Sequence, residues 1–227
     1  MVPPWLHLLS VATLVLGFAC AAAIAVHEWR HPQSMWIMNL VWPVVALFGT
    51  VLALVAYFRY GRAPKDETPA AIVTAKATAH CGAGCTLGDI TAEWLAFVFP
   101  GIATAFGWHW LFGGKMFAIW IVDYLFAFAF GILFQYFTIA PMRDLSPAAR
   151  IIAALKADAL SLSAWQVGMY GFMALAQFVV FRRLLHMPLA VDSPEFWLMM
   201  QIAMLAGFAT SYPINARLLR IGIKEPM

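Results

Sequence analysis

The sequence predicts an all-α integral membrane protein, a bundle of about six transmembrane helices with both termini in the cytoplasm. Of its 227 residues, 63% are hydrophobic and only 11% are charged, whereas soluble domains carry about 25% charged residues. The charged residues gather between long apolar runs, and a helix needs about 20 residues to cross the hydrocarbon core. These runs leave no stretch long enough for a separate soluble core, and a net charge of +3 gives no indication of nucleic-acid binding.

Six runs are long enough to cross a bilayer, and together they predict one membrane domain over residues 1–227. The first has no Lys or Arg before it, unlike a cleavable signal peptide, and is expected to stay as a helix. The fifth and sixth helices begin at Ser146 and Ser193, each an N-cap residue followed by proline at the first helical position. The predicted spans are 5–26, 36–58, 93–111, 116–139, 159–181 and 195–214, with a polar loop over 59–89.

The Lys and Arg residues predict the orientation, because loops that carry them face the cytoplasm. With six crossings and the N-terminus inside, ten of these residues fall on the cytoplasmic side and four on the outer side. This distribution predicts a cytoplasmic position for both termini and for the 59–89 loop.

The strongest local signal is the segment 80–89, H-C-G-A-G-C-T-L-G-D, which Glu93 follows. If the segment is helical, its cysteines and carboxylates share one face at a spacing of four residues. Thiolates and imidazoles are ligands that copper(I) and zinc prefer. The predicted metal site therefore consists of His80, Cys81, Cys85, Asp89 and Glu93. The alternative is a glycine-rich loop whose cysteines pack as small apolar residues.

Polar residues inside predicted spans are expensive to bury and are candidates for function. Asp123 lies two turns into the fourth predicted span, among apolar neighbours, and Asp158 lies at the inner end of the fifth. Together with Gln166 they form a predicted intramembrane relay. The alternative for Asp123 is a structural carboxyl group that hydrogen-bonds a neighbouring helix.

Residues 27–31 read H-E-W-R-H, which matches a zinc-hydrolase motif when it is helical. Pro32 follows directly and disfavours helical geometry at His31. The sequence therefore supports, at most, a weak outer metal site of His27, His31 and His186.

Five motifs together resemble an uncharacterised bacterial integral-membrane family, a domain of unknown function. They are the 80–89 segment, K-A-D-A-L-S-L with Q-V-G-M-Y-G over 156–171, Y-P-x-N at 212–215 and G-I-K-E at 222–225. The resemblance covers roughly residue 79 onward. It implies a multi-pass protein of the bacterial inner membrane and carries no established activity.

The leading hypothesis is a membrane protein that handles a soft metal ion, copper or zinc, as a transporter or a metal-delivery factor. Two alternatives stay open: a membrane enzyme in which Cys81 and Cys85 exchange electrons with a quinone, and a non-catalytic subunit of a membrane complex. The chain has no phosphate-binding loop and no dinucleotide motif. The expected partners are the lipid bilayer, a metal ion and either a second copy or another membrane subunit.

Overall fold

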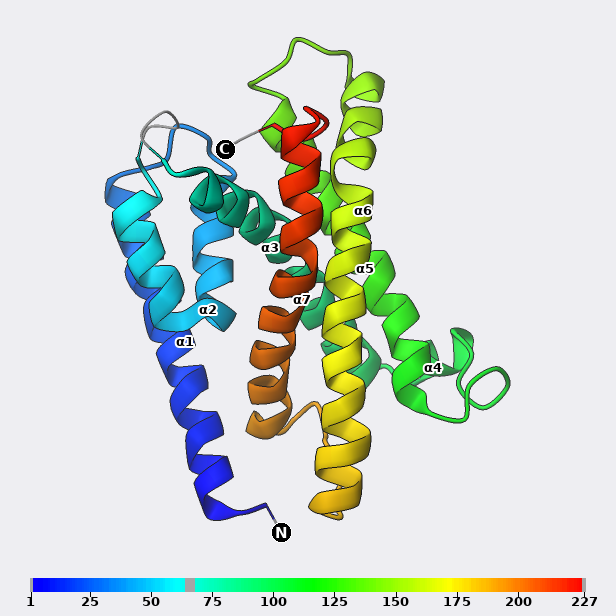
Figure 1. The fold of residues 1–227 in the computed structure, drawn as a ribbon. Coiled ribbons are helices and arrows are strands. Elements are labelled where there is room, and N and C mark those ends of the chain that lie inside the picture. The colour runs from blue at the N-terminus through cyan, green and yellow to red at the C-terminus, as the bar shows by residue number, and fades with distance from the viewer. Residues whose placement is uncertain (1, 64–67, 226–227) are drawn as a thin grey trace.

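The computed structural model describes residues 2–63 and 68–225, and its regular secondary structure there is helical, with no β-strand. This confirms the predicted all-α class. Figure 1 shows the long helices packed side by side in one bundle. In chain order the elements are α1 (Pro4–Arg30), α2 (Met38–Tyr60), α3 (Ala70–Val98), α4 (Gly101–Ala105), α5 (Lys115–Ile139), α6 (Pro147–Ala174), the π-helix η2 (Leu175–Leu184) and α7 (Pro194–Arg220).

Four of the described helices are long and apolar enough to cross a membrane: α1, α2, α5 and the continuous α6–η2 helix. The predicted spans 5–26, 116–139, 159–181 and 195–214 lie within α1, α5, α6–η2 and α7. The two serine caps form as predicted. Ser146 Oγ accepts a hydrogen bond from the Ala149 backbone, and Ser193 Oγ accepts one from Phe196.

α2 is a helical hairpin rather than one continuous helix. At Thr50 the backbone takes φ 44° and ψ −124°, which separates a first arm, 38–49, from a second, 51–60. The arms run side by side: the Trp42 and Tyr57 rings lie 5.5 Å apart, and Met38 lines the same cavity as Arg62. Figure 1 shows the first arm descending from the upper end of the bundle and the second returning to it.

The α2 hairpin therefore differs from the single crossing helix that the sequence predicted over 36–58. Each arm is only about 15–18 Å long at 1.5 Å per residue, half of what a bilayer crossing needs. The tip lies inside the protein, where Gln201 of α7 donates a hydrogen bond to the Leu47 carbonyl at 2.7 Å. Irregular backbone at membrane depth is tolerated where protein buries it in this way.

α3 is the central helix of the bundle, and it differs from the predicted loop over 59–89 and the predicted helix over 93–111. The helix already begins at Ala70, and it ends before Pro100. Its glycines allow close packing: a Cβ added at Gly84 would lie 2.7 Å from Gly131 Cα, and one at Gly88 would lie 2.3 Å from the Ala127 nitrogen. A helix buried on most sides needs small residues more than apolar ones, which explains why hydropathy did not reveal it.

The two ends of the described chain lie at opposite ends of the bundle. His7 of α1 contacts Glu195 at the start of α7, at 2.8 Å, whereas Lys224 lies beyond the end of α7 and contacts Asp158 near the start of α6. Figure 1 shows the N-terminus at the bottom and the C-terminus at the top. Because the α2 hairpin returns to the end where it began, the described part of the chain passes between the two ends of the bundle five times. The sequence had predicted six crossings with both termini in the cytoplasm.

Candidate functional site

One face of α3 carries the chemistry that the sequence singled out. Cys81, Cys85, Asp89 and Glu93 follow one another at intervals of four residues in a continuous helix. The first three are 0% exposed and Glu93 is 4% exposed. The 80–89 segment is helical, so these four residues share one face of α3. This face points into the bundle.

Asp89, Glu93 and Asp123 of α5 form an acidic cluster inside the bundle. The close approach of Gly88 to Ala127 draws α3 against α5 one turn away from Asp123. Asp123 is 0% exposed, and neither of its carboxyl oxygens has a hydrogen-bond partner within the described structure. Asp89 and Glu93 lie within electrostatic reach of it.

Gln166 of α6 joins this acidic cluster. Its side-chain nitrogen donates a hydrogen bond to Asp89 Oδ1 at 3.1 Å. Asp89 Oδ2 and the Gln166 side-chain oxygen have no partner among residues 2–63 and 68–225. The site thus combines unpaired carboxyl oxygens with one amide, all of them buried.

A cavity of about 340 Å³ reaches the acidic cluster from the end of the molecule where α7 begins. Glu93 lies in its wall, together with Lys115 at the start of α5 and Gln177 of η2. Lys115 lies within electrostatic reach of Glu93 and places its ammonium 5.6 Å from the centre of the Trp108 ring. The cavity therefore connects a charged rim to the outermost carboxyl group of α3.

The opposite end of the α3 face meets a second buried polar group, centred on Asp158. Lys224 Nζ donates to Asp158 Oδ1 at 2.5 Å and to Asn215 Oδ1 at 2.8 Å. Ser161 Oγ donates to the same Asp158 oxygen at 2.9 Å, and the Cys81 sulfur lies 3.5 Å from Ser161 Oγ. Asp158 thus lies far along the bundle from Asp123, as the counter-ion of a buried lysine.

The five residues of the predicted metal site do not converge. From His80 to Glu93 the helix axis extends about 20 Å. The His80 ring forms a hydrogen bond with Thr138 of α5 at 2.8 Å, not with the cysteines. Within the described residues, no group of three or more His, Cys, Asp or Glu side chains is placed to hold a metal ion.

The predicted outer histidines also lie apart. His27 and His31 stack at the end of α1, with ring centroids 4.7 Å apart, and His27 bonds the Tyr57 hydroxyl. His186 follows η2 and lines a cavity with Arg182 and Arg183 at the other end of the bundle. These three histidines therefore form no common site.

Sequence reasoning named Asp158 but missed that Lys224 is its partner. The two are 66 positions apart, and the signal that could have linked them was the G-I-K-E motif that follows the last helix. Lys76, which falls within the predicted 59–89 loop, lies on α3 and is only 7% exposed.

Comparison with known proteins supports one assignment. The sequence model of a family described as "Domain of unknown function (DUF4396)" matches residues 72–224. The matched region begins in α3 and includes the acidic cluster and Lys224, while α1 and the α2 hairpin precede it. No curated protein and no solved structure matches the chain.

Proposed function

This chain belongs to the DUF4396 family, and we propose that it is a membrane transport protein that moves protons along the buried carboxyl groups of α3 and α5. One observation carries the proposal: Asp123 lies fully buried in an apolar helix, its two oxygens have no hydrogen-bond partner among the described residues, and two further carboxyl groups lie within electrostatic reach. A buried carboxylate without a partner is costly, so such a group either holds a proton or binds a cation. Ionisable groups inside membrane helices mark proton and ion pathways.

A proton suits this site better than a metal ion. The carboxyl groups do not form a metal-binding group in the described structure, whereas a proton needs only one oxygen at a time. Glu93 takes up and releases protons through the cavity, and Asp89 and Asp123 receive these protons from Glu93. Each transfer breaks one O–H bond on the donor carboxyl group and forms one on the acceptor.

The hydroxyl and thiol groups beyond Asp89 extend the same face toward Asp158. Cys81 and Ser161 are within hydrogen-bonding distance of each other, and Ser161 donates to Asp158. Because all these side chains are buried, the structure corresponds to a closed state. Proton release at the Lys224 end then requires a movement of α6, of α7 or of the segment after α7.

The test uses purified protein in liposomes that contain a pH-sensitive dye, with a potassium diffusion potential as the driving force. Wild-type protein is expected to move protons faster than protein-free liposomes, and Asp123→Asn is expected to abolish the difference. Asn keeps the size of the side chain but cannot carry a proton. Asp192→Asn, at an exposed loop position, is the matched control and should move protons like wild type. Full flux in a folded Asp123→Asn variant would overturn the proposal.

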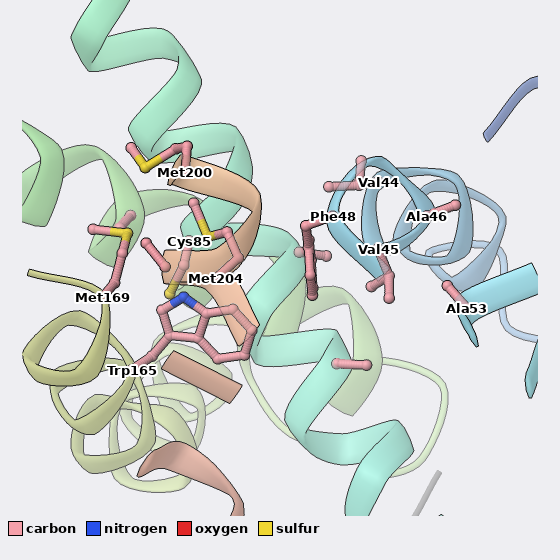
Figure 2. Packing of buried hydrophobic residues seen from close by; sticks show 14 of the residues in the cluster. Val44, Val45, Ala46, Phe48, Ala53, Cys85, Trp165, Met169, Met200 and Met204 are labelled. Atoms are coloured by element: carbon pink, nitrogen blue, oxygen red, sulfur yellow. The ribbon is translucent and has the colours of Figure 1, made fainter. Parts of the chain in front are cut away.

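A second candidate is the binding of a soft metal ion such as copper(I), and the sulfur atoms of the core favour it. Cys85 packs with Met169, Met200 and Met204 in one buried cluster, and Figure 2 shows these side chains grouped around Trp165. Thr86 Oγ1 also donates to the Met204 sulfur at 3.5 Å. Thiolates and thioethers are the preferred ligands of copper(I).

The measurement for this candidate is the metal content after incubation with copper(I) and removal of the excess. Wild type is expected to retain copper, and Cys81→Ser/Cys85→Ser to lose it. Cys20→Ser changes the third buried cysteine, which lies on α1, and should retain copper. Equal copper in all three proteins would exclude a site at the α3 cysteines.

A further inference from the structure

Two cavities meet at Lys76, where the α2 hairpin packs against α3. The first, of about 320 Å³, has polar walls that include Gln33, Ser34 and Arg62. The second, of about 270 Å³, is almost entirely apolar and follows the hairpin toward its tip. Lys76 lines both. These two neighbouring cavities share Lys76 in their walls and together give an amphipathic space, with a basic, polar side and an apolar side.

Lys76 is the unusual residue of this space. Its side chain is buried to a residual exposure of 7%, and no hydrogen bond or ion pair of its ammonium occurs within the described structure. Among the described residues, the Glu28 carboxyl group accepts a hydrogen bond from Gln33 of the cavity wall and forms no ion pair with Lys76. Lys76 lines the polar cavity without a counter-charge among the described residues, and an anionic ligand in that cavity would supply one.

Arg62 adds a second positive charge at the rim. It is exposed, and its guanidinium donates to the His31 and Pro32 carbonyls of the α1–α2 connection. These bonds hold the side chain across the opening of the polar cavity. Two basic groups of this kind suit a phosphate better than a neutral headgroup.

The apolar cavity continues from Lys76 along both arms of the α2 hairpin. Its walls include Trp42 and Val45 of the first arm, Ala56 of the second and Ala75 and Ala79 of α3. Leu52, near the tip, is 74% exposed, so the cavity opens on a surface that faces lipid in a membrane. An extended hydrocarbon chain fits such a groove.

We propose that this space binds an anionic phospholipid, with its phosphate at Lys76 and Arg62 and one acyl chain in the groove of the α2 hairpin. The position supports this occupant. Ten of the thirteen described Lys and Arg residues lie toward the same end of the bundle, the end expected to face the anionic cytoplasmic leaflet. A free anion would satisfy Lys76 but would leave the apolar groove unfilled. The site is separate from the acidic cluster and does not depend on proton transport.

The test measures the binding of a fluorescent phosphatidylglycerol to the purified full chain, against a phosphatidylcholine with the same acyl chains. Phosphatidylglycerol is expected to bind at least tenfold more tightly. Lys76→Met is expected to remove that preference, whereas Lys156→Met, which changes an exposed lysine toward the same end of the bundle, should leave it unchanged. Equal binding of the two lipids, or full preference in Lys76→Met, would overturn the proposal.

A second variant keeps Lys76 and fills the groove. Ala75→Phe places a ring in the apolar cavity and is expected to weaken phosphatidylglycerol binding, with the unfolding temperature measured in parallel. Inorganic phosphate serves as the competitor for a free-anion site. Complete displacement of the lipid by millimolar phosphate, with unchanged lipid binding in Ala75→Phe, would show an anion site and refute the lipid site.

Discussion

Lys224 is a cation enclosed by the bundle, with 0% of its side chain exposed, and Asp158 is its equally buried counter-ion. Gly222, at φ 72°, turns the chain after α7, and the Lys224 backbone donates to the Leu218 carbonyl at 3.2 Å. This turn directs the side chain back between α6 and α7. The Asn215 side-chain oxygen accepts a second hydrogen bond from the Lys224 ammonium.

The ion pair predicts a non-additive pair of substitutions. Lys224→Met leaves the Asp158 charge buried and unpaired, which costs about 3–5 kcal/mol. Lys224→Met/Asp158→Leu removes both charges and is expected to recover most of that stability. Unfolding in detergent is measured for wild type, Lys224→Met, Asp158→Leu and the double variant. The four free energies of unfolding give the coupling energy between the two side chains. Equal destabilisation by the single and double substitutions would contradict a paired role.

Of the glycines of α3, Gly88 leaves the least room for an added Cβ against α5, and this predicts a packing effect. A Cβ there would meet the Ala127 backbone, which cannot rotate away, so Gly88→Ala must push the helices apart. Overpacking of this kind costs about 1–3 kcal/mol. Gly171→Ala is the control, because nothing lies within 4 Å of its added Cβ. A lower unfolding temperature for Gly88→Ala alone is the expected result, and equal temperatures would refute the contact.

At the scale of one element, the α2 hairpin determines how many times the chain crosses. A threonine at φ 44° is uncommon because a β-branched side chain is strained there. The surrounding helices compensate by holding the tip, through Gln201 on Leu47 and through Gly17 of α1. An added Cβ at Gly17 would lie 2.7 Å from the Leu47 oxygen, so α1 fits only with glycine at this point.

Cysteine labelling tests the hairpin directly. Ser34→Cys precedes α2 and Ala63→Cys follows it, and both are expected to react with an impermeant maleimide from the same side of the membrane. The native cysteines are buried, so little background labelling by the maleimide is expected from them. Asp192→Cys, at the other end of the bundle, should react from the opposite side. Labelling of positions 34 and 63 from opposite sides would show that α2 crosses.

At the scale of the whole molecule, five passages lead the described chain from one end of the bundle to the other. Of the thirteen described Lys and Arg residues, ten lie toward the end of the bundle where α1 and α7 end, and three lie toward the end where α7 begins. The positive-inside rule therefore predicts a cytoplasmic C-terminal end and an outer N-terminal end. An epitope before residue 2 should be accessible on intact cells, and one after residue 225 only after permeabilisation. Access to both from one side would contradict this topology.

The sequence predicted the helices whose signals are local or face lipid. Ser146 and Ser193 mark helix starts by their own side chains, and α1 and α5 are apolar because much of their surface is exposed. α3 was missed because hydropathy reports contact with lipid, and α3 contacts protein. Its alanine and glycine content, which suggested a loop, is what allows α5 and Trp165 to approach it.

The reversal of α2 and the pairing of the site residues were not predictable from local sequence, because both depend on residues that are distant along the chain. The two arms of α2 have the composition of a single crossing helix, and one glycine, Gly49, is the only local mark beside the break at Thr50. The stripe from Cys81 to Glu93 followed from the four-residue spacing alone. The pairing of Asp158 with Lys224, and the separation of His80 from the cysteines, required the arrangement of α5, α6 and α7.

The hydrogen bond from Gln201 to the Leu47 carbonyl has a consequence for the order of membrane insertion. Leu47 enters the bilayer about 150 residues before Gln201 is synthesised, and an unpaired carbonyl in hydrocarbon costs several kcal/mol. We therefore expect the α2 hairpin to stay shallow, near the headgroups, until α7 arrives. Its descent to full depth would then be a late step, which follows the assembly of the helices around it. A Gln201→Leu chain that also carries Leu52→Cys should stall at that step, with the new cysteine still reactive toward a water-soluble maleimide.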